Sequence, residues 1–465
     1  MSVLKQKYFG DRAFRRMVLR IAVPVMVQNG ITNFVSLLDN IMVGQVGTEP
    51  MSGVAIVNQL LFVYSLCIFG GLAGAGIFTA QFYGQGDQEG IRQTFRYKLW
   101  TGILLTGAAF AVLLAAGEPL ISLYLNESAE GGDLASTLRY GQSYLLIMLA
   151  GLPAFMMSQI YASSLRECGE TLVPMRAGII AVLVNLTGNW LLIYGHLGLP
   201  RLGVDGAAIA TVLSRYVEMA IVMVWTHTHG KKNPWTAGLY RTLRVPAARA
   251  AQFFRKGFPL LINEALWSSG IATLTQCYSM RGLNVVTAQN ISSTISNLFN
   301  VVFISMGTAI SIIIGQRLGA NRLDEARDSA RKLIVMSIMM SVATGLLLVC
   351  AAPFFPRFYQ TEAGIRTLAT RLMIVNAVFM PLNAFNNACY FTLRSGGKTW
   401  ITFLFDSVCL WVFCIPVAFV LSRYTDMYIV WMLVCVNIAE LLKCFLGLHL
   451  VRKGVWVRNI VGSEP

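Results

Sequence analysis

The chain reads AQFYG at residues 80–84 and GQRLG at residues 315–319, so a Gln and a Gly recur 235 positions apart. The same offset relates other residues on the N-terminal side of this pair. Pro24 pairs with Pro259 in this way, and Gly47 pairs with Gly282. A match at one constant offset over some 60 positions indicates an internal duplication.

A second repeated block lies on the C-terminal side. Residues 165–171 read LRECGET and residues 393–399 read LRSGGKT, at an offset of 228, which also relates Pro153 to Pro381. A shortening of seven residues between the two blocks accounts for the change of offset. One half of the chain is therefore interpreted as an ancient copy of the other.

The composition is that of a membrane protein. The chain has 465 residues, of which 55% are hydrophobic and 13% are charged, against about 25% charged residues in soluble domains. This number of charges is too small to cover the surface of a soluble protein. We therefore expect a polytopic membrane protein. Two duplicated apolar halves are typical of transporters.

Twelve apolar segments are long enough to cross the roughly 30 Å of membrane hydrocarbon as helices. Six fall in each half of the chain. Their expected limits are 17–42, 54–80, 97–117, 137–161, 173–195, 206–226, 254–280, 289–315, 332–352, 367–392, 401–421 and 427–449. The predicted domains are an N-lobe at 1–226, a cytoplasmic linker at 227–252 and a C-lobe at 253–465.

The distribution of charge predicts the orientation. Lys and Arg gather in alternate loops, whereas the loop at 118–136 carries Glu118, Glu127, Glu130 and Asp133. Basic loops stay in the cytoplasm, so both termini are expected there. The net charge of +15 is assigned to these loops and not to nucleic-acid binding. An even number of spans per half gives the two halves the same orientation, with a pseudo-two-fold axis along the membrane normal.

Polar side chains inside the spans mark candidate sites, because such groups are costly in hydrocarbon. The first span carries a stripe at spacings of three and four, formed by Gln28, Thr32, Ser36 and Asp39. The fifth span carries Asn185 and Asn189, one turn apart. Among the few ionisable residues in spans, Arg215 and Glu218 have ion-pair spacing and are interpreted as structural. Asp39 and Glu264 have no such local partner, and each lies in the first span of its half.

Catalytic and metal-binding patterns are weak. The glycines near residues 70–76 lie within a span and indicate close helix packing, not a nucleotide loop. The nine Cys form no CxxC pair and are interpreted as packing residues. No Ser/His/Asp or Cys/His constellation is evident, so we expect neither an enzyme nor a cofactor.

The ordered motifs resemble the MATE (multidrug and toxic compound extrusion) family, bacterial type, of the MOP flippase superfamily. The matching stretches are IAVP at 21–24, DNIMVGQVG at 39–47, AQFYG at 80–84, LRECGET at 165–171, GAAIAT at 206–211, GQRLGA at 315–320 and LRSGGKT at 393–399. The resemblance extends over about residues 15–450. It implies an all-α protein with two six-helix lobes in a V around a central cavity. It also implies a bacterial inner-membrane protein that works as a monomer and exports drugs, as amphipathic organic cations, in exchange for Na⁺ or H⁺.

The resemblance also implies site residues. The first-helix Asp that binds the coupling ion in the family corresponds to Asp39, and its companions correspond to Asn185, Asn189 and Thr211. A subgroup of the family also uses a Glu on helix 7, which corresponds to Glu264. That subgroup has an Asp on helix 10, where this chain has Asn383.

A mechanism follows as a hypothesis. One carboxylate with several neutral oxygens suits Na⁺, and the same desolvated carboxylate could instead take a proton. Neutralisation of Asp39 would let the first helix move at Pro24, where a backbone hydrogen bond is missing. The expected substrate cavity comprises Gln28, Asn33, Tyr144, Glu264, Trp267, Tyr278, Asn297 and Asn383.

Two other readings stay open at this stage. One is a lipid-linked saccharide flippase, or an exporter of an endogenous metabolite, with the same fold. The other is a membrane enzyme or receptor, which the lack of a catalytic constellation and of a soluble domain disfavours.

Overall fold

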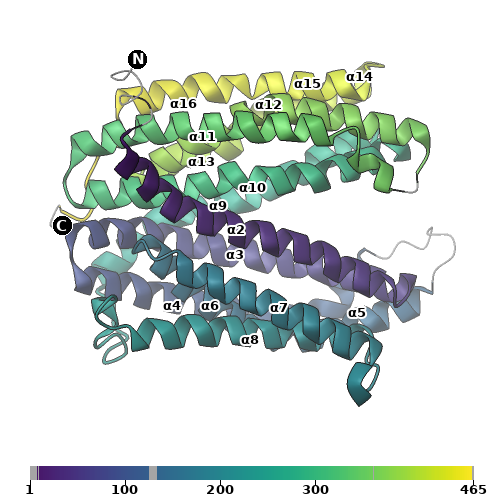
Figure 1. The fold of residues 1–465 in the computed structure, drawn as a ribbon, viewed down its shortest axis with the longest axis horizontal. Coiled ribbons are helices and arrows are strands. Elements are labelled where there is room, and N and C mark those ends of the chain that lie inside the picture. The colour runs from purple at the N-terminus through teal and green to yellow at the C-terminus, as the bar shows by residue number, and fades with distance from the viewer. Residues whose placement is uncertain (1–7, 9, 125–132, 360, 463–465) are drawn as a thin grey trace. The chain divides into compact units, whose positions relative to one another are not determined.

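The computed structural model describes residue 8 and residues 10–124, 133–359 and 361–462 (Figure 1). The loop residues Glu127 and Glu130 lie outside these ranges. Every regular element in the described ranges is helical. The long helices of the first half are α2 (Arg12–Gly44), α3 (Thr48–Gln85), α4 (Gln88–Ser122), α5 (Leu134–Leu149), α6 (Leu152–Glu167), α7 (Leu172–Tyr194) and α8 (Val204–Thr228).

The second half continues in the same way. Its helices are α9 (Ala247–Ser279), α10 (Leu283–Gly319), α11 (Leu323–Ala351), α12 (Ala363–Ser395), α13 (Thr399–Phe403), α14 (Ile415–Tyr424), α15 (Ile429–Ala439) and α16 (Leu441–Lys453). Two π-helical turns, Leu404–Val408 and Leu410–Cys414, connect α13 to α14. Short 3₁₀ turns lie at His196–Gly198, Pro234–Thr236 and Phe355–Phe358.

Helices cover all twelve predicted spans. Ten helices in the described part of the chain are long and apolar enough to cross a membrane, and the bent pair α5 and α6 adds an eleventh if it is one span. The remaining predicted span corresponds to α9, a helix of 33 residues. Asn263 and Glu264 lower the mean hydropathy of this helix. The prediction of an all-α polytopic membrane protein is confirmed.

The span predicted at 137–161 is not one straight helix. It consists of α5 and α6, which meet at a bend of 48°. Gly151 precedes α6 and Pro153 lies in its first turn. Proline has no N–H with which to continue the hydrogen bonds of α5, so the helix breaks there.

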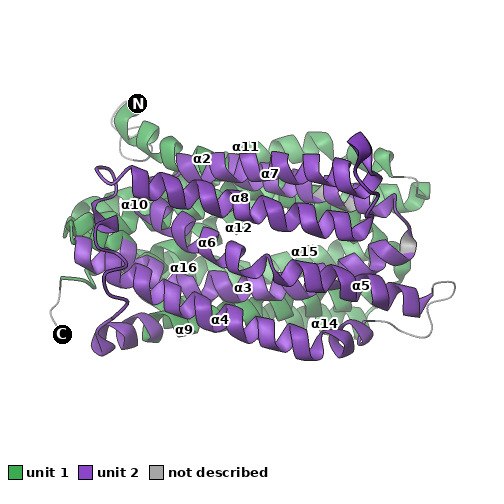
Figure 2. Ribbon diagram, turned by 90° about the horizontal axis from the view of Figure 1, so that it is seen from below, with its two compact units in different colours: residues 1–26, 80–87, 255–465 green, residues 27–79, 88–254 purple. Residues whose placement is uncertain are grey.

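The chain forms two compact units (Figure 2). Unit 1 comprises residues 1–26, 80–87 and 255–465, and unit 2 comprises residues 27–79 and 88–254. Each unit therefore contains chain from more than one segment of the sequence. The lobe boundaries predicted from the sequence stay a prediction.

The repeated Gln-Gly motif has a structural reason within unit 1. A Cβ atom added at Gly84 would lie 1.9 Å from the carbonyl oxygen of Gln316, and one added at Gly319 would lie 1.9 Å from that of Gln81. Backbone therefore approaches backbone at both positions, where only glycine fits. The Gln81 side chain also binds two distant segments of unit 1. Its Nε2 donates to the Ser395 carbonyl at 2.9 Å, and its Oε1 accepts from the Ile460 N–H at 2.9 Å.

The segment after α8 is anchored within unit 2. Three side chains at four-residue spacing on α4 donate to three carbonyl groups at the same spacing in this segment. Arg92 Nε donates to Trp235 O at 3.2 Å, Arg96 Nε to Leu239 O at 3.0 Å and Trp100 Nε1 to Leu243 O at 3.0 Å. Trp235 is only 1% exposed. Residues 235–243 of the predicted linker are thus hydrogen-bonded to α4, although most side chains between 227 and 252 are exposed.

Candidate functional site

A polar cluster in unit 2 brings together the four residues predicted to bind the coupling ion. Asp39 lies on α2, Asn185 and Asn189 lie one turn apart on α7, and Thr211 lies on α8. The Asn189 Nδ2 atom donates to Asp39 Oδ1 at 2.6 Å. This hydrogen bond joins α7 to the carboxylate of α2 directly. Asn185 and Asn189 are 5% and 1% exposed, so the cluster is shielded on the side of α7.

The amide of Asn185 can take two orientations. In one, its Nδ2 lies 3.0 Å from Thr211 Oγ1, and its oxygen faces the carboxylate. With oxygen and nitrogen exchanged, Nδ2 donates to Asp39 Oδ1 and Oδ2 at 2.9 and 3.1 Å, and Oδ1 accepts from Thr211 Oγ1 at 3.0 Å. An ionised carboxylate accepts hydrogen bonds and has none to donate. It therefore favours the second orientation, in which the Asn185 nitrogen and not its oxygen faces Asp39.

One acceptor in the cluster is unpaired. Asn189 Oδ1 is buried and accepts no hydrogen bond from the described residues. A buried acceptor without a partner is costly, by about 1–3 kcal/mol. This oxygen lies on the same amide that contacts Asp39, so a cation or a proton donor bound beside the carboxylate could satisfy it.

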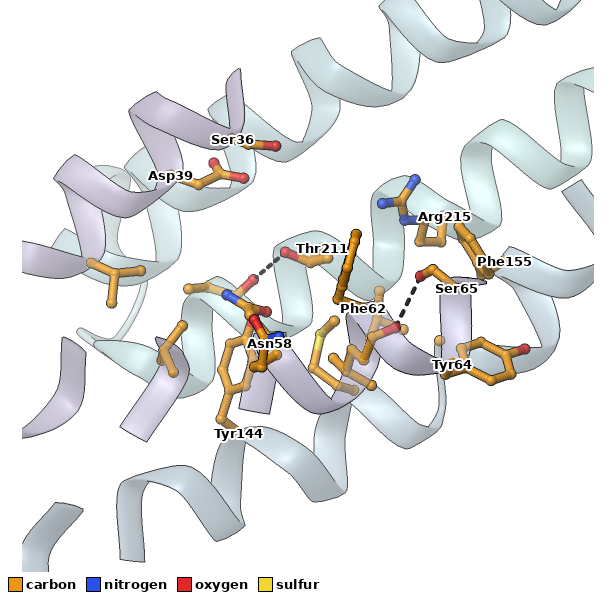
Figure 3. Close-up of a pocket in the computed structure, with 18 of the residues that line it drawn as sticks. Ser36, Asp39, Asn58, Phe62, Tyr64, Ser65, Tyr144, Phe155, Thr211 and Arg215 are labelled. Atoms are coloured by element: carbon orange, nitrogen blue, oxygen red, sulfur yellow. Dashed lines mark hydrogen bonds between the residues drawn. The ribbon is translucent and has the colours of Figure 1, made fainter. Parts of the chain in front are cut away.

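The cluster opens onto a cavity of about 570 Å³ within unit 2 (Figure 3). Its wall comes from α2, α3, α5, α6, α7 and α8. Four aromatic rings contribute to it, those of Phe62, Tyr64, Tyr144 and Phe155. Its polar lining includes Ser36, Asp39, Asn58, Gln59, Ser65, Asn189, Thr211 and Arg215. A mainly apolar wall with a few polar groups is typical of small-molecule sites, and this volume is in their usual range.

Arg215 was not predicted to face the cavity. The ion pair with Glu218 is present, with a distance of 3.3 Å between Arg215 Nη1 and Glu218 Oε2. However, the side chain of Arg215 is 37% exposed and that of Glu218 only 6%. The sequence held a usable signal, because Ala207, Thr211 and Arg215 follow at four-residue spacing and all line the cavity.

Of the other residues in unit 2 that were predicted to line the cavity, one does and two do not. Tyr144 lines the cavity, and its hydroxyl donates to Asn58 Oδ1 at 3.4 Å. Gln28 lies elsewhere, where its Oε1 accepts from Arg166 Nη1 at 3.5 Å. Asn33 is exposed and is not part of the cavity wall.

The remaining predicted residues belong to unit 1. Trp267 on α9 is 39% exposed, whereas Tyr278 on the same helix is 7% exposed and packs in an apolar cluster. Asn297 on α10 is exposed, and Glu264 and Asn383 are half-buried.

Unit 1 holds a separate polar network that sequence reasoning missed. Asp406, which the sequence places near the inner end of its span, within reach of the lipid headgroups, accepts a hydrogen bond from Asn263 Nδ2 at 3.1 Å and pairs with Lys443 Nζ at 3.5 Å. Ser407 Oγ donates to Asn263 Oδ1 at 2.7 Å. These contacts join three helical segments that are far apart in the sequence, and no local spacing reveals them.

Comparison with known proteins identifies the family. The sequence model of the MatE family matches residues 24–191 and 259–420. The chain belongs to the MatE family. The two matched segments begin at Pro24 and Pro259, which are separated by the offset of the internal repeat. The chain is therefore a multi-pass membrane transporter and not an enzyme.

Curated relatives and solved structures agree with this assignment. The chain is 23% identical to a probable multidrug resistance protein NorM of Thermotoga maritima, over 88% of this chain and 86% of the relative. It is 26% identical to the multidrug resistance protein MdtK of Edwardsiella ictaluri, over 90% and 89%. A mutant of the Vibrio cholerae MATE transporter VcmN has a similar fold, with a TM-score of 0.85 and 17% identity over 96% of this chain and 98% of that one. A MOP superfamily transporter from Pyrococcus furiosus gives a TM-score of 0.83 with 20% identity, over 97% of each chain.

In the described part of the chain, no group of three or more His, Cys, Asp or Glu side chains could hold a metal ion. The Asp39 cluster has a single carboxylate. A cation bound there would rely on neutral amide and hydroxyl oxygens, which suits a monovalent hard cation better than a transition metal.

Proposed function

We propose that the protein is a secondary active multidrug efflux antiporter. It exports amphipathic organic cations and takes up Na⁺ or H⁺ in exchange, by alternating access. Relatives named as multidrug resistance proteins support this proposal. So does the cavity with an aromatic wall beside a buried carboxylate cluster.

The observation that carries the proposal is the environment of Asp39. Its carboxylate accepts a hydrogen bond of 2.6 Å from Asn189, whose own oxygen is unpaired among the described residues. Thr211 adds a hydroxyl oxygen, and the Asn185 amide, which can take two orientations, can turn its oxygen toward a cation bound beside the carboxylate. One charge with several neutral oxygens can hold Na⁺, and protonation of the carboxylate would give the same net charge.

Binding of either ion would neutralise the charge of Asp39. The cavity beside the neutral side chain could then close. Pro24 lies inside α2, 15 residues before Asp39 on the same helix. We assign the resulting movement of α2 to Pro24, where the helix lacks one backbone hydrogen bond. One inward positive charge supplies about 2.3 kcal/mol per 100 mV of membrane potential.

The membrane and topology belong to the same proposal. The protein acts as a monomer in the bacterial inner membrane, with both termini in the cytoplasm, as the basic loops predict. In that orientation Asp39, near the C-terminal end of α2, lies in the outer half of the membrane.

Transport in proteoliposomes tests the proposal. Ethidium efflux is measured under an inward Na⁺ gradient or an inward H⁺ gradient, for the wild type and for Asp39→Asn. Asp426→Asn is the matched control, because that side chain is fully exposed. We expect efflux under one gradient, loss in Asp39→Asn and normal efflux in the control. Efflux that persists in Asp39→Asn at equal protein density rejects the role of Asp39. No efflux under either gradient rejects cation export and favours a lipid-linked or endogenous substrate.

A further inference from the structure

We propose that Arg215 is a specificity-determining residue that recognises an anionic group, such as a carboxylate, on the transported molecule. The proposal rests on the proposed function and adds a second, oppositely charged contact to it. The cavity of unit 2 would thus accept an aromatic compound that carries a cationic and an anionic group, with its anionic group toward Arg215.

The first argument is position. Arg215 lies one helical turn after Thr211 on α8, about 6 Å farther along the axis at 1.5 Å per residue. Both residues line the cavity, and Thr211 belongs to the Asp39 cluster. In the view of Figure 3, Thr211 lies between Asp39 and Arg215. The two charged groups are thus displaced from each other along the same cavity.

The second argument is which partner of the ion pair is exposed. Glu218 is almost fully buried, whereas 37% of the Arg215 side chain is exposed. The pair is neutral as a whole, but its positive end faces the cavity and its negative end is buried. Such a pair keeps an arginine charged within the membrane and presents it to a ligand.

The third argument is the number of free donors. A guanidinium has five N–H donors. Within the described residues, Arg215 makes one hydrogen bond, to Glu218, at the long distance of 3.3 Å. The planar group lies 5.3 Å from the centroid of the Phe155 ring, which restricts its orientation. The remaining donors can form the two parallel bonds with which arginine binds a carboxylate.

The cavity wall fits the rest of such a molecule. Phe62 and Phe155 line the cavity with Met148, and the ring of Tyr64 lies 5.9 Å from that of Phe155. An aromatic body can pack on these side chains while its charged ends contact Asp39 and Arg215. A cavity that offered only Asp39 would not prefer a free acid over its ester, because the two carboxylates would repel each other.

A matched pair of dyes tests this inference. At neutral pH rhodamine B, here called the acid, carries an ionised carboxylate as well as its cationic ring system. In rhodamine B ethyl ester this carboxylate is masked. Binding of each dye to the purified protein is followed by fluorescence anisotropy. For the wild type we expect the acid to bind about 10-fold more tightly than the ester, which corresponds to about 1.4 kcal/mol.

The variants are chosen so that a change in dye binding does not result from unfolding of the protein. Arg215→Gln alone would remove the ion-pair partner of the buried Glu218, so the main variant is the double change Arg215→Gln with Glu218→Gln. We expect the ratio of the two dissociation constants to fall to about 1 in this variant and to an intermediate value in Arg215→Lys. Arg371→Gln, which removes an arginine of unit 1, should keep the wild-type ratio.

The outcomes separate this inference from the proposed function. A wild-type ratio near 1, an unchanged ratio in the double variant, or no binding of either dye overturns the role of Arg215. If the ester is still exported in an Asp39-dependent manner, the proposed antiport stands without that role. If the acid binds with the expected ratio but neither dye nor ethidium is exported under any ion gradient, recognition by Arg215 stands and the proposed export fails.

Discussion

Substitution of Asn189 by Ala should reveal which ion the Asp39 cluster binds. The change removes the donor that lies 2.6 Å from Asp39 Oδ1 and the buried oxygen of the same amide. Hydrogen bonds to charged groups contribute about 1.5–3 kcal/mol. Converted at 1.4 kcal/mol per tenfold, this range is a change of about 10- to 150-fold in apparent ion affinity.

The direction of the change depends on the ion. If Na⁺ binds, the variant loses an oxygen ligand, so the Na⁺ concentration for half-maximal efflux should rise. If H⁺ binds, the ionised carboxylate loses a donor that stabilises it, so a lower proton concentration should suffice for half-maximal efflux.

The assay is dye efflux from proteoliposomes at graded Na⁺ concentrations and, separately, at graded pH. Asn437→Ala is the control, because among the described residues the side chain of this Asn on α15 donates one hydrogen bond, to the Leu433 carbonyl of its own helix. An unchanged dependence on both ions in Asn189→Ala would refute the assignment of this amide to the coupling site.

Three further changes test the fold. Gly84→Ala should sharply lower the thermal stability of the purified protein, because its Cβ would lie 1.9 Å from a carbonyl oxygen of α10, whereas Gly107→Ala, with no atom within 4 Å, should not. Lys98→Met should destabilise the protein by about 3–5 kcal/mol, since it breaks an ion pair in which this lysine is fully buried; a melting temperature equal to that of the wild type would contradict this. Asp133 caps α5, and hydrogen bonds from the Ser136 hydroxyl and from backbone N–H groups lower the pKa of its carboxyl. That stabilisation is present above the ordinary pKa of Asp and is lost as the pH falls through the lowered value. The amides at the start of α5 should therefore lose protection against hydrogen exchange in acid, measured against the rate of an unprotected amide at the same pH, and Asp133→Ala should leave them with little protection at any pH.

The helices were predictable because hydropathy and length decide them locally. All twelve expected spans contain helix. The helical stretch extends past at least one predicted end of each span, because polar residues at the membrane surface continue the same hydrogen-bonding pattern. The break in the fourth span was also readable, since Gly151 and Pro153 lie at its centre.

The site was predictable only in part. Family motifs and the stripe on the first span indicated Asp39, Asn185, Asn189 and Thr211, and the structure brings these side chains together. The contact of Arg215 with the cavity was missed, because a three-residue spacing to Glu218 suggests a pair but not which partner faces a ligand.

Contacts between distant segments were beyond local reasoning. Lys443 lies three residues after Glu440, a spacing at which two side chains of one helix can form an ion pair. Instead its Nζ pairs with Asp406, 37 positions earlier in the chain. Only the packing of the helices determines such a choice.

Backbone approaches backbone at Gly84 and Gly319, and this crossing of the two repeats has a consequence for the origin of the chain. A Cβ atom added at either glycine would lie 1.9 Å from the glutamine carbonyl oxygen of the other repeat, so the two close approaches are reciprocal. Reciprocal contacts between identical motifs are the mark of a two-fold interface between equal subunits. An ancestor of half this length could have formed the crossing only by pairing with a second copy of itself. The crossing therefore indicates that a homodimer preceded the gene fusion, and that the fused chain kept the dimer contact as an internal one.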